Sequence, residues 1–197
     1  MNIDGIILAA GLSKRFGRPK QLVEWRGRPL ILHIAETAVA SRLRNVVIVT
    51  GHAANGVRAA LELLAEHPKL TVVYNPEYEE GQASSIRRGL KALPGDADAA
   101  MFLACDQPLV GVELINALIH TFEQHRPLIC YPVFGVNRSN PSIFAAKLFP
   151  ELQKLTGDVG GRVLIEKYKS QVREHKISSW RALADIDTEH DLESLSD

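Results

Sequence analysis

Five apolar runs with the composition of buried strands recur along the chain. They span residues 5–10, 46–50, 70–74, 99–105 and 128–133. Most of these runs are flanked by segments whose apolar residues recur at helical spacing. Runs as apolar as these are typical of strands that are buried on both faces of a sheet. The pattern therefore predicts five strands, most of them inside a sheet that helices cover.

Two segments between the runs have a clear helical period. The apolar residues of the first segment gather on one helix face, which predicts that this face lies on the sheet; they are Leu30, Ile31, Ile34, Ala35, Ala38 and Val39. The segment 111–124 has the same pattern, with Val112, Leu114, Ile115, Leu118, Ile119 and Phe122. Strands that alternate with helices predict an α/β fold, a three-layer sandwich with a mostly parallel sheet and helices on both faces.

Composition places the chain among ordinary globular proteins. It has 197 residues, of which 46% are hydrophobic and 23% charged, and no repeat or low-complexity linker divides it. We therefore expect a single domain over residues 1–197. Lys+Arg and Asp+Glu each number 23, so no basic excess is present to neutralise the phosphates of a nucleic acid. Nucleic acid is not an expected partner.

The cysteines and the apolar runs also bear on the cellular compartment. Cys105 and Cys130 lie far apart in apolar runs, which predicts buried, reduced thiols and neither a disulfide framework nor a zinc site. The apolar run 6–12 has no cation before it, and no run reaches the roughly 18 apolar residues of a membrane span. We expect a soluble, cytoplasmic protein without a membrane partner.

The loop after the first strand, residues 9–20, combines small residues, the hydroxyl of Ser13 and four cations. In open parallel sheets, ligands bind outside the carboxyl ends of the strands. Small residues let backbone N–H groups approach an anion, and Arg and Lys donate to phosphate oxygens. The spacing of Gly11, Gly17 and Lys20 fits neither a dinucleotide fingerprint nor a P-loop. We favour a triphosphate site over a surface turn with solvated cations.

Other polar segments permit two interpretations when only their residues are considered. Asp106 directly follows the fourth run, and it is interpreted either as a Mg²⁺ ligand or as the cap of the helix after Pro108. Ser84 and Ser85 stand in a predicted first helical turn, where capping is the stronger interpretation, and Thr188 is a predicted cap. Propensity alone predicts ordinary loops over 139–144 and 157–162. We also expect packing roles for Trp25 and Trp180 and no zinc pair among the histidines.

The first loop resembles the signature loop of MobA-like nucleotidyltransferases, in particular the molybdenum cofactor cytidylyltransferase branch. The residues that carry the resemblance are Leu8-Ala9-Ala10-Gly11-x-Ser13-x-Arg15-Phe16-Gly17-x-x-Lys20. Relatives that transfer GMP usually carry Gly at the positions of Ala10 and Ser13, so these two residues favour CTP. Further resembling segments follow in the expected order as far as Leu192.

The resemblance implies a role for each matching residue and a Rossmann-like nucleotidyltransferase fold. It implies catalytic roles for Arg15, Lys20 and Asp106, and Mg²⁺ ligation by Asp106 and Asp187. The implied nucleotide-binding residues are Leu8, Ala9, Ala10, Gly11, Ser13, Arg15, Lys20, Gly81, Ser84 and Ser85. The implied acceptor-binding residues are Asn140, Pro141, Gly157, Asp158, Gly160 and Arg162. Ser139 stands where the family usually has Gly, and Gly161 where it usually has Ala.

The implied reaction is transfer of CMP from CTP to a molybdopterin-type cofactor with release of pyrophosphate. A molybdenum enzyme that receives the product is a further expected partner. One alternative keeps the chemistry but changes the base or the acceptor, as in guanylyltransferases, isoprenoid cytidylyltransferases and sugar nucleotidyltransferases. A second alternative is a non-catalytic binding or chaperone module for a molybdenum enzyme. Retention of Lys20, Asp106 and Asp187 argues against that module.

Overall fold

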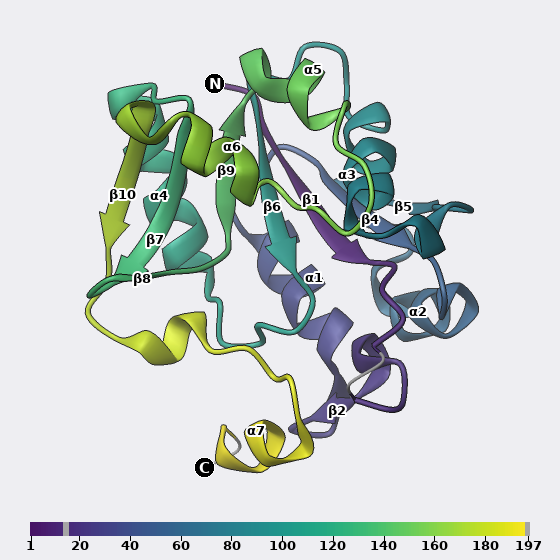
Figure 1. Cartoon of the computed structure of the whole chain (residues 1–197). Helices are drawn as coiled ribbons and strands as arrows, with labels where there is room; N and C mark the ends of the chain where they lie inside the picture. Colours follow the sequence, from purple (N-terminus) through teal and green to yellow (C-terminus); the bar gives the residue numbers. More distant parts are fainter. Residues whose placement is uncertain (14–15, 196–197) are drawn as a thin grey trace.

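The computed structural model describes residues 1–13 and 16–195 and is built around one eight-stranded sheet (Figure 1). The strand order is β10-β7-β9-β6-β1-β4-β5, and β8 pairs with β7. The strands are β1 (Ile3–Ala9), β4 (Val46–Thr50), β5 (Leu70–Tyr74), β6 (Ala99–Ala104), β7 (Ile129–Phe134), β8 (Asn137–Arg138), β9 (Ser142–Ala145) and β10 (Val172–Lys176). Strands β6, β1, β4 and β5 run parallel, so their carboxyl ends lie along one edge of the sheet.

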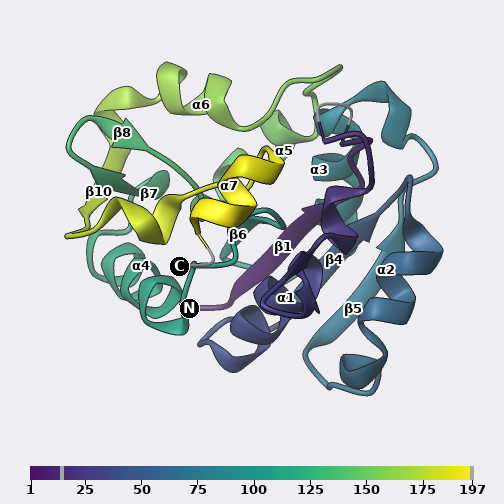
Figure 2. The ribbon, with the colours of Figure 1, turned by 90° about the horizontal axis from the view of Figure 1, so that it is seen from below.

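Helices cover both faces of this sheet (Figure 2). The helices are α1 (Leu30–Ala40), α2 (Ala54–Ala60), α3 (Gln82–Lys91), α4 (Val112–His125), α5 (Phe149–Leu152), α6 (Arg162–Lys167) and α7 (Glu189–Ser194). Buried residues of α1, α2 and α4 form one core with the sheet, and those of α3, α5 and α6 form a second core on the opposite face. The predicted three-layer α/β arrangement is confirmed.

Strand β1 shows how the apolar runs produce this arrangement. Successive side chains of a strand point to opposite faces, and Ile7 packs into the core with α1 whereas Ile6 packs into the core with α3. Both side chains are fully buried. Strand β4 repeats the pattern with Ile48 on one face and Val47 on the other. A strand covered on both faces has no polar side to display, which explains its continuous apolar sequence.

One predicted strand is less buried than its sequence suggests, and one predicted loop is wrong. Strand β5 lies at the edge of the sheet and is only partly buried, and Tyr74 is 42% exposed. The predicted loop over 139–144 contains strand β9, which runs antiparallel between β6 and β7. Ile143 and Phe144 of this short strand are buried on opposite faces, so tertiary pairing overrides the turn-forming residues before it.

A third, smaller core joins the C-terminal segment to a hairpin near the N-terminus. The hairpin consists of β2 (Glu24–Trp25) and β3 (Arg28–Pro29). The buried residues of this core, which we call the C-terminal core, are Val23, Trp25, Leu30, Ile186 and Leu195. Trp25 packs as predicted, but Trp180 is 55% exposed, so its predicted packing role is wrong.

The structure also tests two expectations from composition. Cys105 and Cys130 are free and buried, as predicted. Among residues 1–13 and 16–195, no helix is both long and apolar enough to cross a membrane.

Candidate active site

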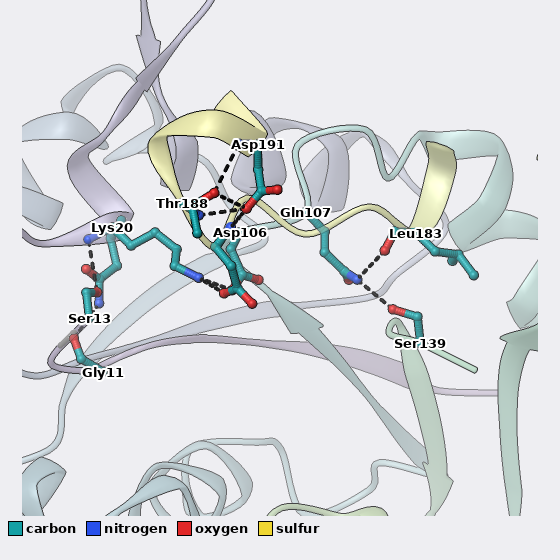
Figure 3. A network of polar contacts seen from close by, with 11 residues as sticks. Gly11, Ser13, Lys20, Asp106, Gln107, Ser139, Leu183, Thr188 and Asp191 are labelled. Carbon is teal, nitrogen blue, oxygen red and sulfur yellow. Dashed lines mark hydrogen bonds and ion pairs between the residues drawn. The ribbon is translucent and has the colours of Figure 1, made fainter. Parts of the chain in front are cut away.

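Lys20 lies between two aspartates at the carboxyl edge of the sheet (Figure 3). Its Nζ atom is 2.9 Å from Oδ2 of Asp106 and 2.5 Å from Oδ1 of Asp187. The Lys20 side chain is only 12% exposed. Burial disfavours its charged form, but the two carboxylates outweigh that effect and raise the pKa of Lys20 above its ordinary value. The ammonium is therefore charged at neutral pH and is held in place by both carboxylates.

Different elements deliver the two aspartates. Asp106 follows the end of β6, and its backbone carbonyl accepts a hydrogen bond of 2.9 Å from the N–H of Ile186. Ile186 is fully buried in the C-terminal core, which brings the next residue, Asp187, to Lys20. Thr188 then begins α7 with a capping box that includes Asp191, as the sequence predicted in part. Asp106 caps no helix, because α4 begins after Gly111.

The donor set at this point fits a divalent cation. Oδ1 of Asp106 is buried and has no hydrogen-bond partner among the described residues. A buried carboxylate oxygen without a partner is unfavourable, and Mg²⁺ binds such hard oxygen atoms. No group of three or more His, Cys, Asp or Glu in residues 1–13 and 16–195 is placed to hold a metal. Asp106 and Asp187 would thus hold the cation together with phosphate oxygens and water, as Mg²⁺ is usually bound.

A third carboxylate, Asp185, lies beside this pair. The residue as a whole is exposed, but its carboxyl group is partly removed from water and faces Asp106 and Asp187. Desolvation and the two neighbouring charges raise the pKa of Asp185 to about 6. The negative charge of the pair thus extends to a third carboxylate, and Lys20 partly offsets it.

The backbone of the first loop is ordered from beneath by Gln21, which sequence reasoning missed. Its Nε2 donates to the carbonyls of Ala9, at 3.0 Å, and Gly11, at 2.9 Å. The backbone N–H of Lys20 donates to Oγ of Ser13 at 3.0 Å. A polar residue in a turn gives no signal that its amide reaches back to the start of the loop. Arg15, for which the resemblance implies a catalytic role, lies outside the described residues.

A pocket of about 550 Å³ opens between this loop and the start of α3. Six of the expected nucleotide-binding residues line it: Leu8, Ala10, Gly11, Ser13, Gly81 and Ser85. Ala9 is buried inside β1 and does not line the pocket. Its volume is in the range usual for small-ligand sites, and the small residues of the loop let backbone groups reach its wall.

The two serines at the start of α3 do not cap it. The helix begins after Gly81, and neither serine accepts from the N–H groups of its first turn; Oδ1 of Asp158 accepts from the first of these, the N–H of Gln82. Instead, Nδ2 of the buried Asn75 donates to Oγ of Ser84, at 2.9 Å, and to Oγ of Ser85, at 3.1 Å. The Ser84 hydroxyl donates to the carbonyl of Gly81, whereas Ser85 lines the pocket. Ser84 thus orders the helix start and Ser85 faces the pocket.

Gly81 is tightly enclosed by the loop that contains Gly157 and Asp158. Its φ is +101°, and a Cβ atom at this position would lie 2.5 Å from the backbone carbon of Gly157. The N–H of Ala83 donates to the carbonyl of Gly157, and that of Gln82 to Oδ1 of Asp158. Asp158, for which the resemblance implied an acceptor role, lines the smaller pocket and is not among the residues that line the larger cleft described next.

A larger cleft of about 1470 Å³ extends from Asp106 towards β7, β8, α6 and β10. Of the expected acceptor-binding residues, Asn140, Gly160 and Arg162 line it, whereas Pro141 is buried beside it. Leu8 and Gln82 line both cavities, which are therefore neighbours. Sequence reasoning missed four cations that line the cleft: Arg138, Lys169, Arg173 and Lys176.

The glycine at position 161 has a local explanation. A Cβ atom there would lie 2.6 Å from Cζ of Phe144. Phe144 belongs to β9, lines the cleft and packs edge-on against Phe102 at 5.7 Å between ring centroids. An alanine at position 161 would therefore require the Phe144 ring to shift.

The fold and this site are those of a nucleotidyltransferase. A loop of small residues and cations follows the first strand of a Rossmann-like sheet, a buried lysine lies between two aspartates, and two cavities are neighbours. The chain belongs to the MobA-like NTP transferase domain family, whose family model matches residues 5–172. It is an enzyme of that family.

Two solved structures and two curated relatives are similar to this chain over most of its length. The crystal structure of Rv0371c from Mycobacterium tuberculosis H37Rv is 27% identical, with a TM-score of 0.85, over 99% of this chain and 97% of that one. Its complex with manganese is 26% identical, with a TM-score of 0.81, over 99% and 98%. The purine catabolism protein PucB of Bacillus subtilis is 30% identical over 95% of this chain and 94% of its own length. Nicotine blue oxidoreductase of Paenarthrobacter nicotinovorans is 32% identical over 84% and 82%.

One relative that matches a shorter part of the chain is named for nucleotidyl transfer. A probable molybdenum cofactor guanylyltransferase of Bacillus cereus is 32% identical over 58% of this chain and 54% of its own length. Divalent metal use is a property of this family of nucleotidyltransferases, and the manganese complex of Rv0371c is consistent with it.

Proposed function

We propose that this enzyme transfers CMP from CTP to a molybdopterin-type cofactor and releases pyrophosphate. The observation that carries the proposal is the placement of Lys20 between Asp106 and Asp187 at the carboxyl edge of the sheet. Asp106 lines the larger cleft, and Ser13, which accepts from the N–H of Lys20, lines the smaller pocket. Charged groups are thus concentrated where a bound triphosphate and an acceptor would face each other.

In the proposed reaction, a phosphate oxygen of the acceptor attacks the α-phosphorus of CTP. A new P–O bond forms as the bond between the α- and β-phosphates breaks, and pyrophosphate leaves with the electron pair. Transfers of this kind depend on positioning and on stabilisation of charge, so no protein nucleophile is required. The Gln21 amide orders the loop beneath the phosphates, and Lys20 supplies a fixed positive charge.

Mg²⁺ is the proposed metal, held by Asp106 and Asp187. When bound, such a cation polarises phosphate oxygens and neutralises the charge that develops on them. The unpartnered Oδ1 of Asp106 supports this assignment. Arg15 is proposed, from the resemblance alone, as a further cation on the phosphates.

The preference for CTP rests on Ala10 and Ser13, both of which line the smaller pocket. A site shaped for one base leaves polar groups unpaired when another base binds. For the acceptor, the larger cleft has ample volume, since pockets for small ligands usually measure about 300–1,000 Å³. A bulky fused-ring acceptor is compatible with such a cleft, and Asn140, Gly160 and Arg162 are proposed to contact it. A molybdenum enzyme is the proposed recipient of the product.

The test is to incubate the protein with molybdopterin, Mg²⁺ and each of the four nucleoside triphosphates in turn, and to measure pyrophosphate. We expect release that requires the acceptor and is fastest with CTP. Comparable kcat/KM for GTP and CTP would reject the base preference. Release that needs a phosphorylated sugar or an isoprenoid precursor in place of molybdopterin would reject the acceptor.

A further inference from the structure

Gln107 connects two segments that are far apart in the sequence (Figure 3). It follows Asp106 and is 1% exposed. Its Nε2 donates to Oγ of Ser139 at 2.7 Å and to the carbonyl of Leu183 at 3.2 Å. These partners lie 32 and 76 residues further along the chain. One buried amide group thus joins the end of β6 to two distant parts of the molecule.

Each of the two segments contributes to the site. The acceptor-side loop, residues 137–141, lines the larger cleft through Ser139 and Asn140. The C-terminal segment, residues 183–187, contains Asp185 and ends at Asp187, which contacts Lys20. Gln107 therefore lies between the proposed acceptor site and a proposed metal ligand.

The contact with Ser139 depends on the hydroxyl group of that residue. Glycine, which the family resemblance leads one to expect at this position, has no side chain to accept a hydrogen bond. The hydroxyl gives the Gln107 amide an acceptor on the loop, in addition to the Leu183 carbonyl. The amide thereby donates to acceptors on separate segments, and on the second segment it also has a hydrogen bond to the Asp185 carboxyl.

The oxygen atom of the same amide group is not paired in this way. Oε1 of Gln107 is buried without a hydrogen-bond partner among the described residues. A buried acceptor left unpaired is unfavourable, and a methionine of similar length would avoid this cost. Space filling alone therefore does not explain a glutamine here, whereas hydrogen bonding to Ser139 and Leu183 does.

We propose that Gln107 is a positioning residue that ties the acceptor-side loop to the C-terminal segment and so holds Asp187 opposite Asp106. Ile186 and the capping box at Thr188 fix the backbone at and beyond Asp187. The hydrogen bond from Gln107 fixes the backbone at Leu183, four residues before Asp187. The role in catalysis rests on the proposed function, whereas the tie itself does not.

The tie is tested by hydrogen exchange of the whole protein without substrates. In Gln107→Met, amides of residues 183–187 and 137–141 should exchange faster than in the wild type, while those of β1 and β6 keep their protection. Ser139→Ala should produce the same change in the loop and a smaller one at 183–187. The double variant should exchange no faster than Gln107→Met. Unchanged exchange at 183–187 in both single variants overturns the tie, and Ser139→Ala keeps the test valid if Gln107→Met does not fold.

The effect on the site is measured as the affinity for Mn²⁺. Binding is followed by the loss of the free-ion signal in electron paramagnetic resonance. Outer-shell partners of metal ligands are worth about 10- to 100-fold in metal affinity, and we expect Gln107→Met to weaken Mn²⁺ binding by about 10-fold. In turnover, kcat should fall while KM for CTP stays unchanged. Gln153→Met, at an exposed glutamine, is the matched control.

The two proposals fail in distinguishable ways. If the wild type releases no pyrophosphate but Gln107→Met speeds amide exchange at residues 183–187, the proposed function is rejected and the tie is retained. A folded Gln107→Met protein that binds Mn²⁺ as tightly as the wild type would overturn the positioning role even if the wild type is fully active.

Discussion

The Nζ atom of Lys20 lies 2.5 Å from Oδ1 of Asp187, a residue 167 positions further along the chain. The same ammonium is 2.9 Å from Asp106, so one cation contacts both carboxylates that are proposed to hold a metal and offsets part of their charge. Two carboxylates repel each other at short range unless a positive charge lies between them. Lys20 therefore keeps the two ligands close together and ready for a metal.

We predict that Lys20→Ala lowers kcat and kcat/KM together, by about 10²- to 10³-fold, because a fixed charge that acts in the transition state is lost. Steady-state kinetics with varied CTP provides the measurement. Lys154→Ala, at an exposed lysine, is the control and should keep wild-type rates. A Lys20→Ala enzyme with normal kcat and only a raised KM would show that Lys20 merely helps to hold the triphosphate.

Arg15 is expected to behave differently. Its planar guanidinium suits a grip on phosphate oxygens in the ground state as well as in the transition state. Arg15→Ala should therefore raise KM for the nucleotide in addition to lowering kcat. Equal kinetic signatures for Arg15→Ala and Lys20→Ala would contradict this distinction.

Asp106→Asn should abolish turnover and leave the fold intact. The neutral amide is a much poorer Mg²⁺ ligand, and the expected loss is about 10²- to 10³-fold in kcat. Circular dichroism would establish that the fold is retained. Asp98→Asn is a matched control, because Asp98 is exposed and precedes the opposite end of the same strand, β6. Unchanged pyrophosphate release by well-folded Asp106→Asn would reject the metal role.

Those parts of the fold that depend on local pattern could be predicted from the sequence. The strands Val46–Thr50 and Leu70–Tyr74 have the predicted bounds, because β-branched runs bounded by polar residues carry their own signal. Strand β9 was missed because it has only four residues and exists through its pairing with β6 and β7. Its formation is decided by distant residues, which a local pattern does not contain.

The site divides in the same way. Asp106 could be located from its place at the end of an apolar run, whereas the role of Asp187 came from resemblance alone. Nothing near Asp187 in the sequence indicates that burial of Ile186 would carry it to Lys20. The amides of Gln21 and Gln107 were missed for the same reason, since their partners lie 10 to 76 residues away.

Gly81→Ala is predicted to destabilise the protein and to impair nucleotide binding. A non-glycine residue at φ +101° is strained, which by itself costs about 1–3 kcal/mol, and its Cβ would meet the backbone of Gly157. Urea unfolding gives the change in the free energy of unfolding. Gly95→Ala, where a Cβ meets nothing within 4 Å, should change it by no more than about 0.5 kcal/mol. Equal stability of the two variants would contradict the assigned enclosure of Gly81.

His175 should make stability depend on pH. Burial lowers the pKa of His175, whose Nδ1 lies 2.9 Å from Oγ1 of Thr121. As pH falls through about 6.5, the unfolded chain takes up a proton that the folded protein still excludes, so the free energy of unfolding decreases. His175→Gln removes this contribution. Unfolding at pH 7.5 and pH 5.5 should therefore show a smaller decrease for the variant, and identical decreases would refute the effect.

The C-terminal core contains few buried residues and is separate from the two large cores that hold the sheet. Small packed units of this kind open at a lower free energy than the molecule as a whole. Opening of this unit would remove Asp187 while β1 and β6 stay paired and Asp106 keeps its place. Catalytic competence and structural integrity are therefore separable in this enzyme. In a denaturant titration, activity should be lost at a lower concentration than the ellipticity of the sheet and its helices.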